Sequence, residues 1–109
     1  MDDRERRIAA NEAVFRQANE ELEALQGSTP GTRLDLLCEC GVQDCTDTLE
    51  LRAEEYQLVR ADPLQFAVKP GHETHDVETV IARHDGYFVV RKDDPEAQAL
   101  VRATDQRSD

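Results

Sequence analysis

The sequence predicts an α+β fold: an N-terminal amphipathic helix followed by a small antiparallel β structure with an inserted helix, closed by a zinc site. Three observations support it. Apolar residues recur at helical spacing through residues 4–26, paired runs of strand-forming residues follow, and the three cysteines all lie within residues 38–45. A chain of 109 residues has room for one domain. We expect an N-terminal helix and linker over 1–32, a zinc-binding β-rich domain over 33–92 and a polar C-terminal tail over 93–109.

The chain is strongly acidic. It has 24 Asp and Glu residues against 13 Lys and Arg residues, and a formal net charge of −11. Such a chain is repelled by nucleic-acid phosphates and by anionic membrane surfaces, so we expect neither as a partner. No apolar run approaches the length of a membrane span, and MDDRERRIAA lacks the apolar core of a secretory signal. These features predict a cytoplasmic protein whose partners are proteins or small ligands.

Residues 4–26 predict the first helix. Its apolar residues fall on one stripe at alternating three- and four-residue steps. The stripe comprises Ile8, Phe15, Ala18, Leu22 and Leu25, with Asn11 completing the series. This spacing suits a helix packed on its own domain and also a coiled-coil seam, in which Asn11 would fix the register of a dimer; otherwise Asn11 faces solvent. The stripe is the candidate surface for a protein partner or for self-association.

The same helix carries mixed charges, which usually stabilise a solvated face. We expect such a face from Arg4, Arg6, Arg7 and Arg16 together with Glu5, Glu12 and Glu20. The run QGSTPGT, residues 26–32, combines Gly, Ser, Thr and Pro and must end the helix.

A hairpin and a second helix are expected next. RLDLLCEC, residues 33–40, predicts a strand that enters a tight loop, and TLEL, residues 48–51, predicts its antiparallel partner. Residues 52–62 predict a helix with Tyr56 and Val59 on one face.

The C-terminal half predicts a second hairpin. FAVKPGH, residues 66–72, reads as an extended segment that runs into a Pro-Gly turn. VETVIARHDGYFVVRK, residues 77–92, is apolar on both sides of an Asp-Gly pair, the typical signal of a tight hairpin. Its interior positions are expected to form much of the core: Val80, Ile81, Phe88, Val89 and Val90. From Asp93 onward we expect a short helix at best and then a frayed tail.

The cysteines have the pattern C-x-C-x4-C. In a reducing cytoplasm, an odd number of clustered cysteines indicates metal binding or redox reactivity rather than disulfides. An extended backbone places Cys38 and Cys40 on the same side, and Gly41 permits the reversal that brings Cys45 to the same ion. A β-rich domain over 33–92 is marginal without a staple, and structural zinc contributes on the order of 10 kcal/mol of binding free energy.

Structural zinc prefers a closed tetrahedron, commonly of three cysteines and one histidine. His72 follows the Pro-Gly turn, which presents a ligand rigidly, and is the favoured fourth ligand. His75 is the alternative on the same loop, and His84 is expected on the surface of the hairpin. Alternatively, the cysteines are small buried apolar residues and bind no metal. Carboxylates at Glu39 and Asp44 argue against that alternative, because a buried apolar segment rarely alternates with them.

Several segments together resemble a family of small uncharacterised bacterial proteins: CECGVQDC, then EEYQLVRADPLQFAVKPGHE and HDGYFVVRK, after an N-terminal helix similar to RRIAANEAVFRQANEEL. The resemblance covers residues 4–92, and its most specific parts are CECG and the Pro-Gly-His-Glu turn. It implies that Cys38, Cys40, Cys45 and His72 share one site. It implies no activity.

Three classes of function compete. The first is a zinc-stabilised interaction or regulatory module. The second is a thiol redox switch, in which oxidation of the cysteines releases zinc. The third is a zinc enzyme with an open coordination position and Glu73 or Asp76 as the base, which four protein ligands and the lack of any catalytic motif disfavour. Glu73 or Asp76 is more simply expected to hold the free ring nitrogen of His72.

Overall fold

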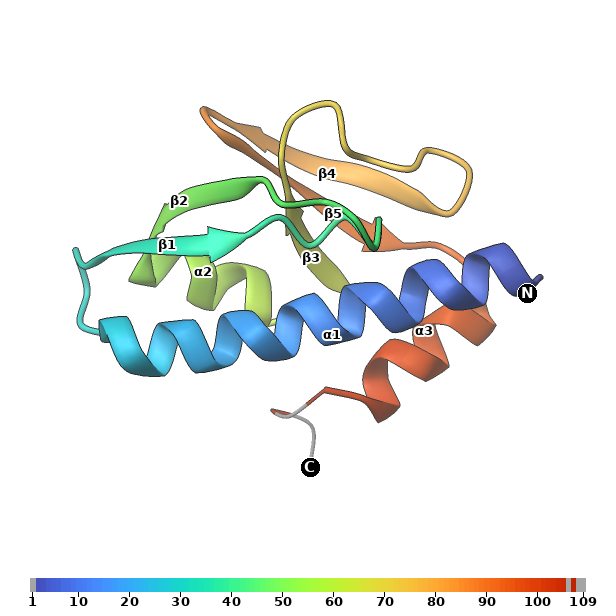
Figure 1. The fold of residues 1–109 in the computed structure, drawn as a ribbon, viewed down its shortest axis with the longest axis horizontal. Helices are drawn as coiled ribbons and strands as arrows, with labels where there is room; N and C mark the ends of the chain where they lie inside the picture. Colours follow the sequence, from blue (N-terminus) through green and yellow to red (C-terminus); the bar gives the residue numbers. More distant parts are fainter. Residues whose placement is uncertain (1, 106, 108–109) are drawn as a thin grey trace.

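The predicted α+β fold is present in the computed structural model, which describes residues 2–105 and residue 107 (Figure 1). Its helices are α1 (Asp3–Gln26), α2 (Ala53–Arg60) and α3 (Pro95–Ala103). Its strands are β1 (Arg33–Leu37), β2 (Thr48–Arg52), β3 (Gln65–Val68), β4 (Glu78–His84) and β5 (Tyr87–Lys92). Both predicted hairpins and both of the helices predicted before residue 63 are confirmed.

The strands form two small antiparallel sheets. In the first, β1 pairs with β2, so that Leu34 faces Leu51 and Leu36 faces Leu49, and all four side chains are buried. The second has the order β3-β5-β4. The two sheets meet where β2 contacts β5, and α2 packs against β2 and β3. Tyr56 of α2 is fully buried, as expected for the inner face of that helix.

The predicted core of the second hairpin is correct except at one position. Val89 and Val90 are buried, and Val80 and Phe88 are half-buried. Ile81, however, is 46% exposed. The register of β4 against β5 shifts between Val80 and Ala82, so Ile81 is the extra residue of a β-bulge. A bulge breaks the alternation of inner and outer side chains that the prediction assumed.

The long helix α1 lies along the sheets, with β1 and α3 in contact with it (Figure 1). Its innermost face is mostly polar, which the sequence analysis did not predict. The buried residues are Ala9, Glu12, Ala13, Arg16, Asn19 and Glu23. The predicted apolar stripe is rotated away from the interior, since Ile8, Phe15, Ala18 and Leu22 are only half-buried and Leu25 is 84% exposed.

Arg16 was expected on a solvated face, and this prediction is wrong because its side chain is fully buried. It donates hydrogen bonds to the carbonyl oxygens of Pro63 and Val101, each over 2.6 Å. Its guanidinium carbon lies 4.7 Å from the centre of the Phe66 ring. A buried guanidinium is tolerated when backbone oxygens and a ring face replace water in this way.

Glu12 is buried as well, and its partner is a lysine from the end of β5. Lys92 Nζ lies 2.9 Å from Glu12 Oε1 and 3.4 Å from Glu78 Oε1. Glu12 and Arg16 of α1 therefore meet groups 47 to 85 positions away in the chain, which local sequence spacing does not reveal.

The same helix binds the outer side of β1 through two side-chain amides. Asn19 donates to the carbonyl oxygen of Leu37 over 2.9 Å and accepts from its N–H over 2.7 Å. Gln26 makes the same pair of bonds to Asp35, over 2.9 and 2.8 Å. Both strand residues turn their backbone groups away from β2, which follows from the alternation along an antiparallel strand.

The described part of the segment after residue 93 is more structured than the frayed tail expected there; residues 106, 108 and 109 of that tail lie outside the described residues. Asp94 caps α3 by accepting hydrogen bonds from the N–H groups of Glu96 and Ala97, and Pro95 occupies the first turn. Ala97 and Val101 are buried, and α3 packs against α1. The interior is thus built from both ends of the chain as well as from residues 33–92.

Within the part of the chain that the structure describes, no helix is both long enough and apolar enough to span a membrane.

Candidate metal centre

The loop between β1 and β2 carries all three cysteines. It leaves β1 in an extended conformation, because Cys38 N–H still bonds to Asp47 O over 3.0 Å. Gly41 then reverses the chain with a φ of 77°, a conformation that favours glycine. A turn in which Cys45 N–H bonds to Val42 O over 3.0 Å returns the third cysteine toward the first two.

The histidine comes from the turn after β3, as predicted. His72 N–H bonds to Lys69 O over 2.9 Å, and Gly71 takes a φ of 93°. This tight turn places the imidazole over the cysteine loop, although the two segments are far apart in sequence.

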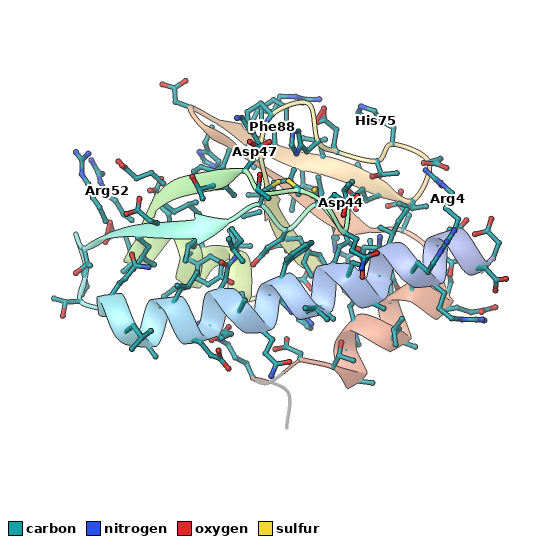
Figure 2. All side chains as sticks on the ribbon, viewed as in Figure 1. Arg4, Asp44, Asp47, Arg52, His75 and Phe88 are labelled. Atoms are coloured by element: carbon teal, nitrogen blue, oxygen red, sulfur yellow. The ribbon has the colours of Figure 1, made fainter. Side chains whose placement is uncertain are left out.

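Cys38, Cys40, Cys45 and His72 come together, with one ligand atom from each lying within 4.8 Å of all the others. In Figure 2 the yellow sulfur atoms gather beside Asp47. His72 Nδ1 lies 3.5 Å from Cys38 Sγ and 3.6 Å from Cys45 Sγ. A tetrahedral zinc ion with Zn–S distances of about 2.3 Å and Zn–N distances of about 2.0–2.1 Å separates sulfur and nitrogen ligands by about 3.6 Å. The two Nδ1–Sγ distances therefore match edges of a zinc tetrahedron, and all four ligand atoms lie close enough together to surround one ion.

The second ring nitrogen of His72 has a carboxylate partner. Its Nε2 lies 3.2 Å from Asp47 Oδ2. A histidine that binds metal through one nitrogen usually donates its other N–H to such a group, which fixes the tautomer and the ring orientation. Asp47 is the residue that closes the cysteine loop, so one short segment provides three sulfurs and the carboxylate.

The residues expected at that position lie elsewhere. Glu73 accepts a hydrogen bond from Gly71 N–H and lies 3.9 Å from His75, while Asp76 accepts one from Arg4 over 2.7 Å. The His75 side chain is 74% exposed and points away from the sulfur atoms (Figure 2). His75 is thus outside the cluster, and neither Glu73 nor Asp76 orients His72.

No protein-family model, curated protein or solved structure matches this chain. The resemblance to a family of small bacterial proteins stays a prediction.

Hydrogen bonds among the thiols shift the pKa values of Cys38 and Cys40 in opposite directions. A hydrogen bond from Cys38 lowers the pKa of Cys40 to about 5, and the backbone N–H of Val42 adds to the effect. The same bond to Cys40, together with burial, raises the pKa of Cys38, and burial raises that of Cys45. The N–H of Lys69 also bonds to Cys38 Sγ over 3.1 Å. The cluster thus favours at least one thiolate near neutral pH, and the thiolate is the form that binds metal.

The two inner cysteines are buried, whereas Cys45 and His72 are half-exposed. A surface hollow of about 510 Å³ lies against them, lined also by Val42, Asp47 and Glu73. An ion has an entry path on this side of the loop.

The presence of Glu39 between the first two cysteines counted against a buried segment, and at this residue that inference is wrong, because Cys38, Glu39 and Cys40 are all buried. The Glu39 side chain is fully buried. Its carboxylate accepts hydrogen bonds from Asn19 Nδ2 and the Tyr56 hydroxyl, each over 2.8 Å, and from Ala67 N–H over 2.9 Å. Burial raises the pKa of Glu39, and these donors oppose the shift.

The Cys-Glu-Cys pattern has a physical explanation in this geometry. Side chains alternate along extended backbone, so Cys38 and Cys40 point toward Cys45 and His72, while Glu39 points into the interior. The same alternation that predicted the paired cysteines was the available signal for Glu39. Asp47 had no comparable signal, because the loop that brings it to His72 is irregular.

Proposed function

We propose that the protein binds one zinc ion through Cys38, Cys40, Cys45 and His72, and that the ion stabilises the fold of a small interaction or regulatory module. The observation that carries the proposal is the gathering of three sulfur atoms and one imidazole nitrogen within 4.8 Å of one another, with two of the sulfur–nitrogen distances at 3.5 and 3.6 Å. Thiolate and imidazole ligands select zinc over magnesium or calcium, which prefer oxygen ligands.

A structural role is favoured over a catalytic one. Three thiolates and one imidazole complete a tetrahedral shell, whereas catalytic zinc keeps one position for water. The ion would join the β1–β2 loop to the turn after β3, and so would link the two sheets. Sheets of two and three strands have little stability of their own, and zinc binding contributes on the order of 10 kcal/mol.

The outer side of α1 is the surface we propose for a protein partner or for a second copy of the chain. Val14 and Leu25 are 62% and 84% exposed, and Ala18, which shares their face by helical spacing, is half-buried. Sedimentation of the zinc-loaded protein at increasing concentration tests self-association; a monomer throughout would leave only a different protein as partner.

The first test is elemental analysis of untagged protein together with thermal unfolding, with and without a chelator. We expect about one zinc per chain, lost in Cys45→Ser and His72→Ala, and a large fall in the melting temperature on chelation. His75→Ala is the matched control, because that histidine lies on the same loop but outside the cluster. Zinc retained in His72→Ala, or a melting temperature that the chelator does not change, would contradict the proposal.

A further inference from the structure

Glu39 stands between the metal ligands and the helix α1. We propose that Glu39 couples metal occupancy to the docking of α1. Bound metal would hold residues 8–19 of the helix against the cysteine loop, and metal release would loosen that segment. This inference rests on the proposed metal site and adds a mode of regulation to it.

Glu39 lies between two of the proposed metal ligands in the sequence. Its neighbours Cys38 and Cys40 are fixed when they bind an ion, and the intervening peptide units then fix Glu39 as well. The buried carboxylate joins three elements at once, namely α1 through Asn19, α2 through Tyr56 and β3 through Ala67. A shift of the cysteine loop therefore changes hydrogen bonds in the interior.

Further contacts join α1 to the cysteine loop. Besides Asn19, the side chain of Asn11 donates to Gly41 O over 3.1 Å. Gly41 packs so closely on α1 that an added Cβ would lie 2.8 Å from Ile8 O and 3.0 Å from Glu12 Cγ. Residues 8–19 of α1 thus lie directly on the loop that carries the ligands (Figure 1).

The docked face of α1 is mostly polar. Glu12, Arg16 and Asn19 are fully buried. Polar groups are stable in the interior only with particular partners at hydrogen-bonding distance, whereas apolar surfaces tolerate sliding. If the loop relaxed, the hydrogen bond between Asn19 and Glu39 would break. Water would then hydrate the exposed polar groups and favour separation of the helix segment from the loop.

The far half of α1 provides an internal reference. Gln26 bonds to both backbone groups of Asp35, as Asn19 does to Leu37, but within the described part of the chain its hydrogen bonds do not reach Glu39 or the cysteine loop. Two residues of the same chemical type thus clamp the same helix to the same strand, and only Asn19 is linked to the ligands.

Coupling of this kind is reciprocal, because any state that favours the docked helix must also favour bound metal. Weakening the helix contact should lower metal affinity even though no ligand changes. The consequence for regulation is that metal loss would make the polar inner face of residues 8–19 available to a partner.

Two measurements test the coupling. In the wild-type protein, hydrogen exchange of residues 8–19 should accelerate about tenfold or more on chelation, and more than that of α3. Competition with a chromophoric chelator should show that Asn19→Ala weakens zinc binding by about tenfold, within the usual range of coupling between sites. Gln26→Ala should change the affinity by less than about twofold.

The outcomes separate this inference from the proposed site. Zinc that binds and is lost by chelation with no change in exchange at residues 8–19 would overturn the coupling and leave the metal site standing. Equal effects of Asn19→Ala and Gln26→Ala would also overturn it. If Asn19→Ala does not fold, Tyr56→Phe removes a single donor to Glu39 and should weaken zinc binding in the same direction. Absence of zinc from the wild-type protein would refute both proposals.

Discussion

Glu12 lies against Glu78 and Lys92 in the interior, with its Oε1 2.9 Å from Lys92 Nζ. Burial, reinforced by the charge of Glu78, raises the pKa of Glu12 well above its usual range, and Lys92 opposes the shift. Folding therefore holds a proton on this carboxyl group more tightly than the unfolded chain does, and stability depends on pH.

Replacing Glu12 with Gln should reveal that dependence. The unfolded chain releases the proton above a pKa of about 4.3, so wild-type stability declines from there until pH reaches the raised folded-state pKa. Glu12→Gln lacks this decline, and its free energy of unfolding relative to wild type should rise as the pH increases above about 4.3, the unfolded-state pKa of Glu. Urea unfolding of the metal-loaded proteins measures it, with the exposed Glu21→Gln as control; parallel pH profiles for Glu12→Gln and wild type would contradict the assignment.

The fate of single residues shows where sequence reasoning stops. Cys38, Cys40, Cys45 and His72 were predictable because the alternation of an extended segment and a Pro-Gly turn are local rules. Arg16 and Glu12 were not, since a charged residue on a helix is normally solvated and their partners lie far along the chain.

For helices and strands, the position of each element in the sequence follows local signals, whereas its orientation depends on long-range contacts. The hydrophobic runs, the Asp-Gly turn and the Gly-, Ser-, Thr- and Pro-containing run after residue 26 predict both hairpins and the two helices before residue 63. The rotation of α1 about its axis is set instead by Arg16, Asn19 and their distant partners. An apolar stripe of modest width does not outweigh several specific buried hydrogen bonds, so Leu25 faces solvent.

Gly41 tests the close approach between α1 and the cysteine loop. Gly41→Ala should destabilise the protein through both its positive φ and the contact with the backbone oxygen of Ile8, and should weaken metal binding. Gly31→Ala shares the positive φ but meets nothing within 4 Å, so it should cost only about 1–2 kcal/mol. Thermal unfolding and zinc competition compare the two; equal losses in both variants would show that the close packing at Gly41 has no special weight.

At the scale of the molecule, the last described residues close a network with α1 and α2. Arg60, whose side chain is fully buried, lies 2.6 Å from Glu20 and 2.5 Å from Asp105. Arg107 reaches Glu20 and Glu23, each over 2.8 Å. These contacts connect the segment after α3 to the first helix, and a polar C-terminal composition gave no indication of them.

Asp105→Asn should therefore destabilise a chain whose C-terminal segment looks dispensable by composition. Loss of one charged partner of a buried guanidinium costs about 2 kcal/mol, since Glu20 still pairs with Arg60. Glu50→Gln, in an exposed pair with Arg33, should change stability by less than about 1 kcal/mol. Urea unfolding of metal-loaded protein distinguishes them; similar midpoints for the two variants would argue against a structural role for the segment.

The amide contacts of Asn19 and Gln26 also protect the protein against aggregation through β1. Together they occupy the outward N–H and C=O groups of Leu37 and Asp35, where another strand would otherwise pair. The helix therefore shields a sheet edge that would otherwise be a template for aggregation. Conditions that lift α1 from β1 should convert a well-behaved protein into one that forms β-rich aggregates, beginning at this strand.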